Sequence, residues 1–156
     1  MTKIAKRWLI GGAIGLVVLF AAAFTVAVII PHDSRVRLES YGKSESVYLD
    51  DKEYEQMIAD KRSFLIMVNR PGCIRTDDMS TWFLEYPEEM QFKYYSMSWA
   101  HAKDTSLHNY VKYAPSIAVI RSGEVIAWLD ADSEEDEKYF GDPEELKTWL
   151  KKYIIF

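Results

Sequence analysis

The sequence predicts an α/β fold, a mixed sheet with helices on both faces, preceded by one transmembrane helix. Three observations carry this prediction. The run from Trp8 to Ile30 is almost wholly apolar and uncharged, and about 20 such residues suffice to cross a bilayer. Residues 64–68 are continuously apolar, as expected of a strand covered on both sides. Strand and helix patterns alternate along the chain until a hairpin and a closing helix end it.

Composition narrows the class of protein. The 156 residues allow one modest domain plus appendages. Of the 19 Lys and Arg residues only Lys3, Lys6 and Arg7 precede Ile30, so 16 basic and all 24 acidic residues follow it, a net charge of −8. That charge argues against a nucleic-acid partner. The single cysteine excludes an intrachain disulfide and a Cys-rich metal site, and we expect no metal and no cofactor.

The amino-terminal part predicts a membrane anchor. Residues 1–7 form a basic tail, residues 8–30 the transmembrane helix and residues 31–46 a polar linker. The alternative is a cleaved signal peptide, whose apolar core is normally about 7–15 residues and therefore shorter than this run. The basic tail favours a cytoplasmic amino terminus. We therefore expect a single-pass protein of the cell membrane, in contact with membrane lipid through this helix, with its carboxy-terminal domain extracytoplasmic.

Residues 47–156 form the predicted folded domain. Asp50 and Glu53 have the spacing of a capping box, and Asp142-Pro143 opens a closing helix. Ser122-Gly123 marks a hairpin. The tryptophans Trp82, Trp128 and Trp149 lie at inward positions of the expected elements and are predicted to be core residues. The expected strands are 46–49, 64–68, 92–99, 117–120 and 125–129. The expected helices are one capped by Asp50, one from 74 to about 86, one over 106–113 and a final one capped by Asp142.

Two stretches carry a family resemblance. In the first, a buried strand enters the Pro71-Gly72 turn and Cys73 lies at the start of the following helix. In the second, Ala114-Pro115 opens the hairpin. Together they resemble the thioredoxin family, whose redox site faces a cis-proline, and the resemblance covers nearly all of residues 47–155. It implies a thioredoxin-like three-layer fold, a mixed sheet with flanking helices.

The resemblance assigns expected roles residue by residue. Cys73 falls on the attacking cysteine and Thr76 on the resolving one, so the motif is Cys-Ile-Arg-Thr with a single cysteine. Pro115 falls on the cis-proline, which would hold the Ala114 backbone beside Cys73, where it could pair with an extended peptide. Met67 stands where many thioredoxins bury an acidic proton acceptor. Because the chain has one cysteine, it cannot carry out the dithiol cycle of the family.

Two function classes stay open. In the first, the protein is a membrane-tethered monothiol that forms mixed disulfides with envelope proteins, with Cys73 and Thr76 as its catalytic residues. A helix N-terminus favours the thiolate, and the Thr76 hydroxyl is expected to donate a hydrogen bond to the sulfur. In the second, Cys73 is a small buried hydrophobe, the commonest state of a free cysteine. The protein is then a non-catalytic thioredoxin-like binding or assembly module, or an accessory to peptide export. Both classes imply an extracytoplasmic protein or peptide partner, and the sequence leaves enzymatic activity undecided.

His101 and the acidic stretch 130–137 each have a functional and a purely structural interpretation. His101 follows the third strand and is either a base near Cys73 or, more often in such a place, an exposed loop residue. The acidic stretch 130–137 lacks the central glycine and the spacing of an EF-hand calcium loop, so a solvated loop is the better interpretation.

Overall fold

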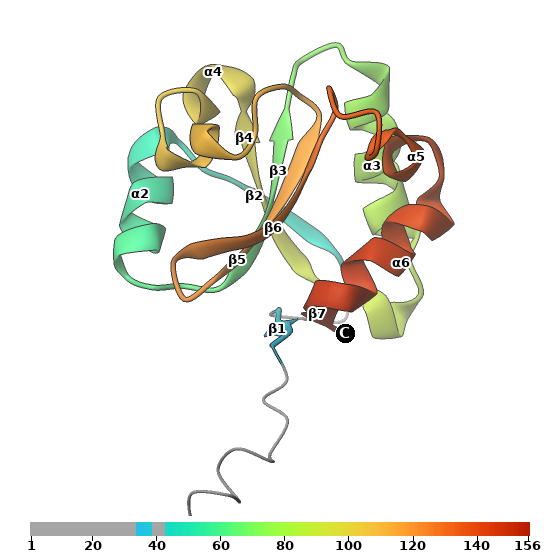
Figure 1. Cartoon of the computed structure of the whole chain (residues 1–156). Helices are drawn as coiled ribbons and strands as arrows, with labels where there is room; N and C mark the ends of the chain where they lie inside the picture. Colours follow the sequence, from blue (N-terminus) through green and yellow to red (C-terminus); the bar gives the residue numbers. More distant parts are fainter. Residues whose placement is uncertain (1–33, 39–42) are drawn as a thin grey trace, which may run out of the picture. The chain divides into compact units, whose positions relative to one another are not determined.

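The computed structural model describes residues 34–38 and 43–156 (Figure 1). The chain separates into two units, residues 1–34 and 35–156, and the fold below is that of the second unit. The predicted basic tail and the apolar run of residues 8–30 lie outside the described residues. Within the described ranges, no helix has the length and apolar character needed to cross a membrane.

A five-stranded mixed sheet forms the centre of the domain, in the order β2-β4-β3-β5-β6. The strands β2, β4 and β3 run parallel, whereas β5 is antiparallel to both β3 and β6. This order, with the central parallel strands followed by an antiparallel hairpin, is that of a thioredoxin-like fold. The strands are β2 (Glu45–Tyr48), β3 (Phe64–Asn69), β4 (Lys93–Ser98), β5 (Ser116–Arg121) and β6 (Glu124–Asp130).

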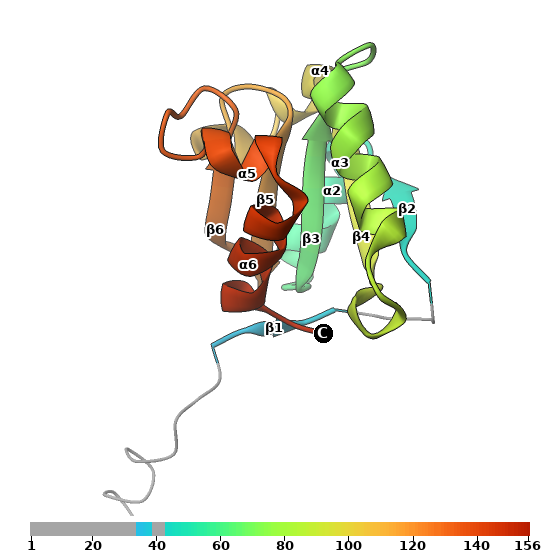
Figure 2. The same cartoon turned by 90° about the vertical axis from the view of Figure 1, so that its right-hand side faces the viewer.

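Helices cover both faces of the sheet (Figures 1 and 2). One face carries α2 (Asp51–Ala59), α4 (Trp99–Ala102) and the 3-10 helix η2 (Ser106–Asn109). The other carries α3 (Ile74–Glu85), α5 (Glu137–Gly141) and α6 (Pro143–Tyr153), with the 3-10 helix η1 (Glu88–Met90) after α3. Each face has its own core, and β3 contributes to both. Phe64, Ile66 and Val68 pack on the α2 side, whereas Leu65 and Met67 pack on the α3 side, which explains why this strand is continuously apolar.

The predicted caps form as the sequence indicated. The Glu53 backbone N–H donates to Asp50 Oδ1 at 2.8 Å, and the Asp50 backbone N–H donates to Glu53 Oε2 at 3.0 Å, which completes the capping box of α2. At α6 the Glu144 N–H donates to Asp142 Oδ1 at 2.8 Å, behind Pro143 in the first turn. These local bonds fix where the two helices begin.

The linker prediction for residues 31–46 is wrong in part. The structure places a short strand, β1 (Val36–Arg37), in this segment, paired in parallel with β7 (Ile154–Ile155) at the end of the chain. Val36 and Leu38 are buried in the α3-side core, and β2 begins at Glu45. Two apolar residues among polar ones give no periodic signal, because their partners lie at the far end of the sequence. The domain therefore begins before residue 47.

Three further expectations differ from the structure. Trp128 is 44% exposed, because it lies on the edge strand β6. Its ring packs against the Tyr110 ring, with the ring centroids 5.2 Å apart. Trp149 is buried and Trp82 packs partly against the core, as expected. The helix predicted over 106–113 is only the short η2, and α4 and α5 were not predicted, since elements of four or five residues carry no helical period.

Candidate functional site

Cys73 is the N-cap residue of α3, immediately after the turn that leaves β3. Its carbonyl accepts the backbone N–H groups of Thr76 at 3.0 Å and Asp77 at 3.3 Å, and its own N–H donates to Arg70 O at 3.1 Å. The backbone is therefore fully engaged, whereas the side chain makes no capping bond and is half-buried. A thiol in this place stands next to the unpaired N–H groups of a helix N-terminus.

Gly72 shapes the turn before the cysteine. Its φ is +76°, in the left-handed region that residues with a side chain rarely adopt. A Cβ placed on Gly72 would meet nothing within 4 Å, so backbone conformation alone makes glycine the favoured residue. The turn directs the chain from the sheet into α3 and sets where Cys73 emerges.

Thr76 lies one helical turn beyond Cys73, but its hydroxyl does not serve the expected role in this structure. The side chain is buried, and Oγ1 has no hydrogen-bond partner among the described residues. The expected hydrogen bond from Oγ1 to the sulfur is therefore not formed. The physical reason is that Thr76 belongs to the inward face of α3, with Met79 and Phe83.

The second site segment lies at the same end of the sheet as Cys73. Val68 of β3 is opposite Ser116 of β5, so the Cys73 turn leaves β3 where β5 begins. The Ala114–Pro115 peptide bond, which immediately precedes β5, is cis. Ser116 Oγ donates to Tyr113 O at 2.7 Å and holds the loop closed behind the proline. The sheet register thus gathers the Cys73 turn and the Pro115 loop at one end of the domain.

Exposed apolar side chains accompany both segments. Ile74, directly after the cysteine, is 77% exposed, and Tyr113, directly before Ala114, is 53% exposed. Tyr113 stacks on Trp99 with an interplanar angle of 5° and a centroid distance of 6.5 Å. Trp99 and Tyr113 were not predicted as site residues, although the position of Tyr113 next to Ala-Pro was a signal that could have found it. These side chains form exposed apolar surface beside the Cys73 turn and the Pro115 loop.

The charged side chains near Cys73 include groups of both signs. Arg75 Nη2 lies 3.6 Å from Glu137 Oε1, with both groups well exposed, and the carboxylates of Asp77 and Asp78 occupy the first turns of α3. Exposed pairs of this kind contribute little to stability. Arg75 therefore faces a carboxylate from α5.

His101 is engaged elsewhere than at the cysteine. Its Nδ1 lies 3.1 Å from Asp51 Oδ1, at the start of α2. The backbone N–H of Asp51 and the His101 ring together hold the pKa of the Asp51 carboxyl below its usual value. His101 therefore lies in α4 with its polar partner on the α2 side.

The acidic stretch 130–137 forms a loop closed by its own carboxylates. Asp130 Oδ2 accepts the Lys112 N–H at 2.8 Å, and Asp136 Oδ2 accepts the Asp130 N–H at 3.0 Å. Within residues 34–38 and 43–156, no group of three or more His, Cys, Asp or Glu side chains could hold a metal ion. These carboxylates therefore order a turn before α5.

Comparisons with known proteins give similarity of fold only. No protein-family model matches the sequence, and no curated protein matches it. Among solved structures, thioredoxin f from spinach chloroplast is 8% identical over 72% of this chain and 96% of its own, with a TM-score of 0.49. A thioredoxin from Malassezia sympodialis is 13% identical over 74% and 95%, also at 0.49. Thioredoxin O2 from Arabidopsis thaliana is 15% identical over 70% and 94%, at 0.47. These likenesses assign no role to any residue of this chain.

Proposed function

We propose that this chain is a membrane-tethered protein of thioredoxin-like fold whose Cys73 forms mixed disulfides, as a single thiol, with extracytoplasmic proteins. The observation that carries the proposal is the position of Cys73. Cys73 is the half-buried N-cap residue of α3. Its backbone N–H and carbonyl form hydrogen bonds, whereas its sulfur forms no capping hydrogen bond. A thiol at a helix N-terminus with access to solvent is the arrangement that favours thiolate chemistry.

The chemistry needs a disulfide on the partner protein. The Cys73 thiolate attacks one sulfur of that disulfide, the partner's S–S bond breaks, and its second sulfur leaves as a thiolate. The number of disulfides is unchanged, and the new one joins the two proteins. The chain has no second cysteine, so release of the partner requires a thiol from another molecule. Met67, buried in β3, offers no proton acceptor for that step.

The loop before β5 supplies the place for a peptide. Ala114 is half-buried and precedes the cis bond at the start of β5, with Tyr113 and Ile74 exposed on the segments to either side. An extended peptide gains affinity from backbone pairing and selectivity from side-chain contacts of this kind. We assign Ala114 and Pro115 to peptide binding and Cys73 to the covalent step.

The tether rests on the sequence before the domain. The uncharged apolar run 8–30 directly follows Lys6-Arg7, and the domain begins at Arg35. We assign this run to a membrane-spanning helix, with the domain on the extracytoplasmic side. Disulfides persist in such compartments, which places the proposed substrates there.

The surroundings of Cys73 favour a second function. The Thr76 hydroxyl has no bond to the sulfur, and Arg75 is paired with Glu137, so neither side chain supports a thiolate in this structure. The exposed apolar residues Ile74 and Tyr113 would equally suit a non-catalytic module that binds or assembles extracytoplasmic proteins.

Trapping with a simple disulfide tests the proposal. The full chain is incubated with glutathione disulfide and analysed intact by mass spectrometry, with Cys73→Ser as the matched control. The proposal predicts that the folded wild-type protein gains one glutathione and the control gains none. A folded protein that stays unmodified, and gains glutathione only in denaturant, would favour the binding module.

A further inference from the structure

The two ends of the sheet differ in their balance of charge, because carboxylates outnumber cations at the Cys73 end although Arg70, Arg75 and Lys103 also lie there. The Cys73 end carries the acidic stretch 130–137 together with Asp50, Asp51, Asp77 and Asp78. At the opposite end β3 and β4 begin and β5 ends, because Phe64 pairs with Ile120 and Lys93 starts β4. We name this opposite end the basic end. It carries exposed cations from five separate segments: Arg37, Lys43, Lys61, Arg121, Lys151 and Lys152.

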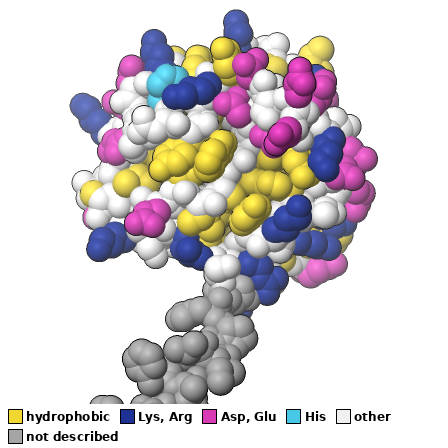
Figure 3. Space-filling model, viewed as in Figure 1, with side chains coloured by type: hydrophobic (Ala, Val, Ile, Leu, Met, Phe, Trp, Pro, Cys, Tyr) yellow, Lys and Arg dark blue, Asp and Glu magenta, His cyan; other side chains and the backbone are white. Residues whose placement is uncertain are grey.

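Contacts within the domain bring these segments together. The Gly123 N–H donates to Arg62 O at 3.0 Å, which holds the β5–β6 turn against the segment after α2. The β1–β7 pair lies at this end too, with Lys151 and Lys152 in the last turn of α6 just before β7. In Figure 3 Lys and Arg side chains stand along the lower end of this face and also at its top, whereas Asp and Glu predominate at the upper right. Six carboxylates also lie at the basic end, and the six exposed cations together with Arg62 and Lys93 outnumber them: Glu45, Asp60, Glu85, Glu88, Glu89 and Glu124.

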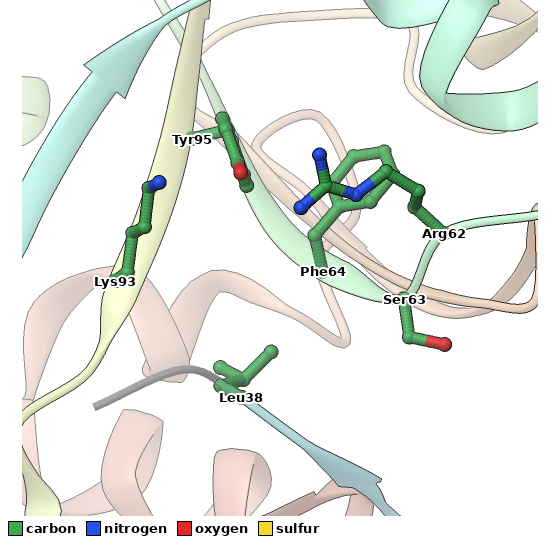
Figure 4. Close-up of a pocket in the computed structure, with 6 residues that line it drawn as sticks. All are labelled: Leu38, Arg62, Ser63, Phe64, Lys93 and Tyr95. Carbon is green, nitrogen blue, oxygen red and sulfur yellow. The ribbon is translucent and has the colours of Figure 1, made fainter. Parts of the chain in front are cut away.

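A small pocket at the basic end shows how the cations are arranged. Leu38, Arg62, Ser63, Phe64, Lys93 and Tyr95 line it. The charged ends of Lys93 and Arg62 lie on either side of the Tyr95 hydroxyl (Figure 4). Lys93 Nζ also lies 5.4 Å from the centroid of the Tyr95 ring. Leu38, which directly follows β1, lines the same pocket.

We infer that the basic end is a docking surface for the headgroups of anionic lipids, so that the domain stands on the bilayer with Cys73 directed away from it. This inference rests on the membrane tether of the proposed function. Only residues 31–34 separate the end of the apolar run at Ile30 from Arg35, and an extended chain of that length spans at most roughly 14 Å. The domain's first residues belong to the basic end, so that end must stay near the surface from which the run emerges.

Charge complementarity selects the lipid. Near an anionic membrane surface each Lys or Arg strengthens attraction by about fivefold, within a Debye length of about 8 Å. In the opposite orientation the acidic Cys73 end would face the same surface and be repelled by it. The charge at both ends of the sheet therefore favours the orientation that leaves the site of the proposed function open to partners.

Lysine footprinting of the full chain tests the inference. The protein is placed in nanodiscs of phosphatidylcholine alone, or of phosphatidylcholine mixed with phosphatidylglycerol, and acetylated with an activated acetate ester before mass spectrometry. We expect acetylation of Lys61, Lys151 and Lys152 to slow at least threefold in the anionic discs. Lys103 and Lys138, at the Cys73 end, should react equally in both. High salt should remove the difference.

A pair of variants provides the matched control. Lys151→Glu combined with Lys152→Glu should abolish the protection of Lys61, whereas Lys103→Glu should leave it intact. Equal rates in the two lipids, or equal slowing at Lys103 and Lys138, would overturn the inference while leaving the tether in place. A chain that co-purifies with neither disc would contradict the tether and the docking surface together. Thiol reactivity of Cys73 is measured separately and is unaffected by either result.

Discussion

Val68 of β3 lies opposite Ser116 of β5, and this antiparallel pair brings together the two segments of the candidate site. Cys73 follows β3 through the Gly72 turn, and the cis Ala114–Pro115 bond precedes β5. Neither segment is near the other in sequence. The register of one strand pair is therefore the structural basis of the proposed site, and the turns at its borders should be sensitive to substitution.

A series of glycine substitutions compares the turn before Cys73 with the β5–β6 turn. Gly72→Ala should lower the free energy of unfolding by about 1 kcal/mol, because φ is +76° but space is open. Gly123→Ala should cost more, at least about 2 kcal/mol, because φ is +81° and the new Cβ would lie 2.5 Å from Ile58 O. Gly141→Ala is the control, since nothing lies within 4 Å, and should leave stability unchanged or up to about 1 kcal/mol higher. Urea unfolding of the three variants gives the order, and equal losses at Gly123 and Gly141 would contradict the structure.

The alkaline limit of stability should depend on Tyr54. Burial raises the pKa of Tyr54 from 10.0 to about 12. The folded pKa lies above the unfolded one, so this contribution to stability is complete below about pH 10 and is lost as the pH rises toward 12. Tyr54→Phe should therefore flatten the fall of the free energy of unfolding across that window. Burial raises the pKa of Tyr94 as well, so part of the fall remains.

At neutral pH the same variant should be nearly silent. Tyr54 Oη is buried without a hydrogen-bond partner among the described residues, so its removal should change stability by less than about 1 kcal/mol. Tyr48→Phe, at a 53% exposed position, is the control for the loss of a phenol. An alkaline profile of Tyr54→Phe that matches Tyr48→Phe and wild type would contradict the burial argument.

Sequence reasoning succeeded where the signal was local or strongly periodic. Asp50 with Glu53, the Ser122-Gly123 turn and the apolar run 64–68 each depend on neighbouring residues, and each formed as predicted. The β1–β7 pair was missed because Val36 and Ile154 are far apart in the chain. Trp128 was misplaced because an apolar residue on an edge strand looks the same in sequence as one in the core.

The site was predicted less completely than the fold. The position of Cys73 at the start of a helix follows from the Pro-Gly turn, which is a local signal. The orientation of the Thr76 hydroxyl depends on how α3 packs against the sheet, which spacing along one helix does not determine. The same holds for His101, whose partner Asp51 comes from a helix that precedes it by 50 positions.

Thr76 variants separate a structural from a chemical role. Oγ1 is buried without a partner among the described residues, so Thr76→Val, which replaces the hydroxyl with a methyl group, should keep or raise stability by up to about 1 kcal/mol. It should also leave the rate of Cys73 alkylation unchanged within about twofold, because the structure has no bond from Oγ1 to the sulfur. A markedly slower alkylation at unchanged stability would restore the role in thiolate support that the sequence predicted.

A second cysteine tests the geometry of the motif. Thr76→Cys places a thiol one helical turn from Cys73, at the N-terminus of α3, and should permit an internal disulfide on mild oxidation. The free-thiol count should then fall from two to none in the monomer, whereas Thr81→Cys, further along the exposed surface of α3, should keep both thiols. Two titratable thiols in oxidised Thr76→Cys would show that the sulfurs do not meet.

We propose that Cys73 reacts as a single accessible thiol in the folded protein. Its rate of labelling by iodoacetamide tests this reactivity. The rate is measured at neutral pH for the full chain in its native state and in denaturant, with Cys73→Ser as the blank. Because Cys73 is half-buried at a helix N-terminus with no capping bond, we expect the folded chain to be labelled at least as fast as the unfolded chain. Labelling that appears only after unfolding would contradict the monothiol function.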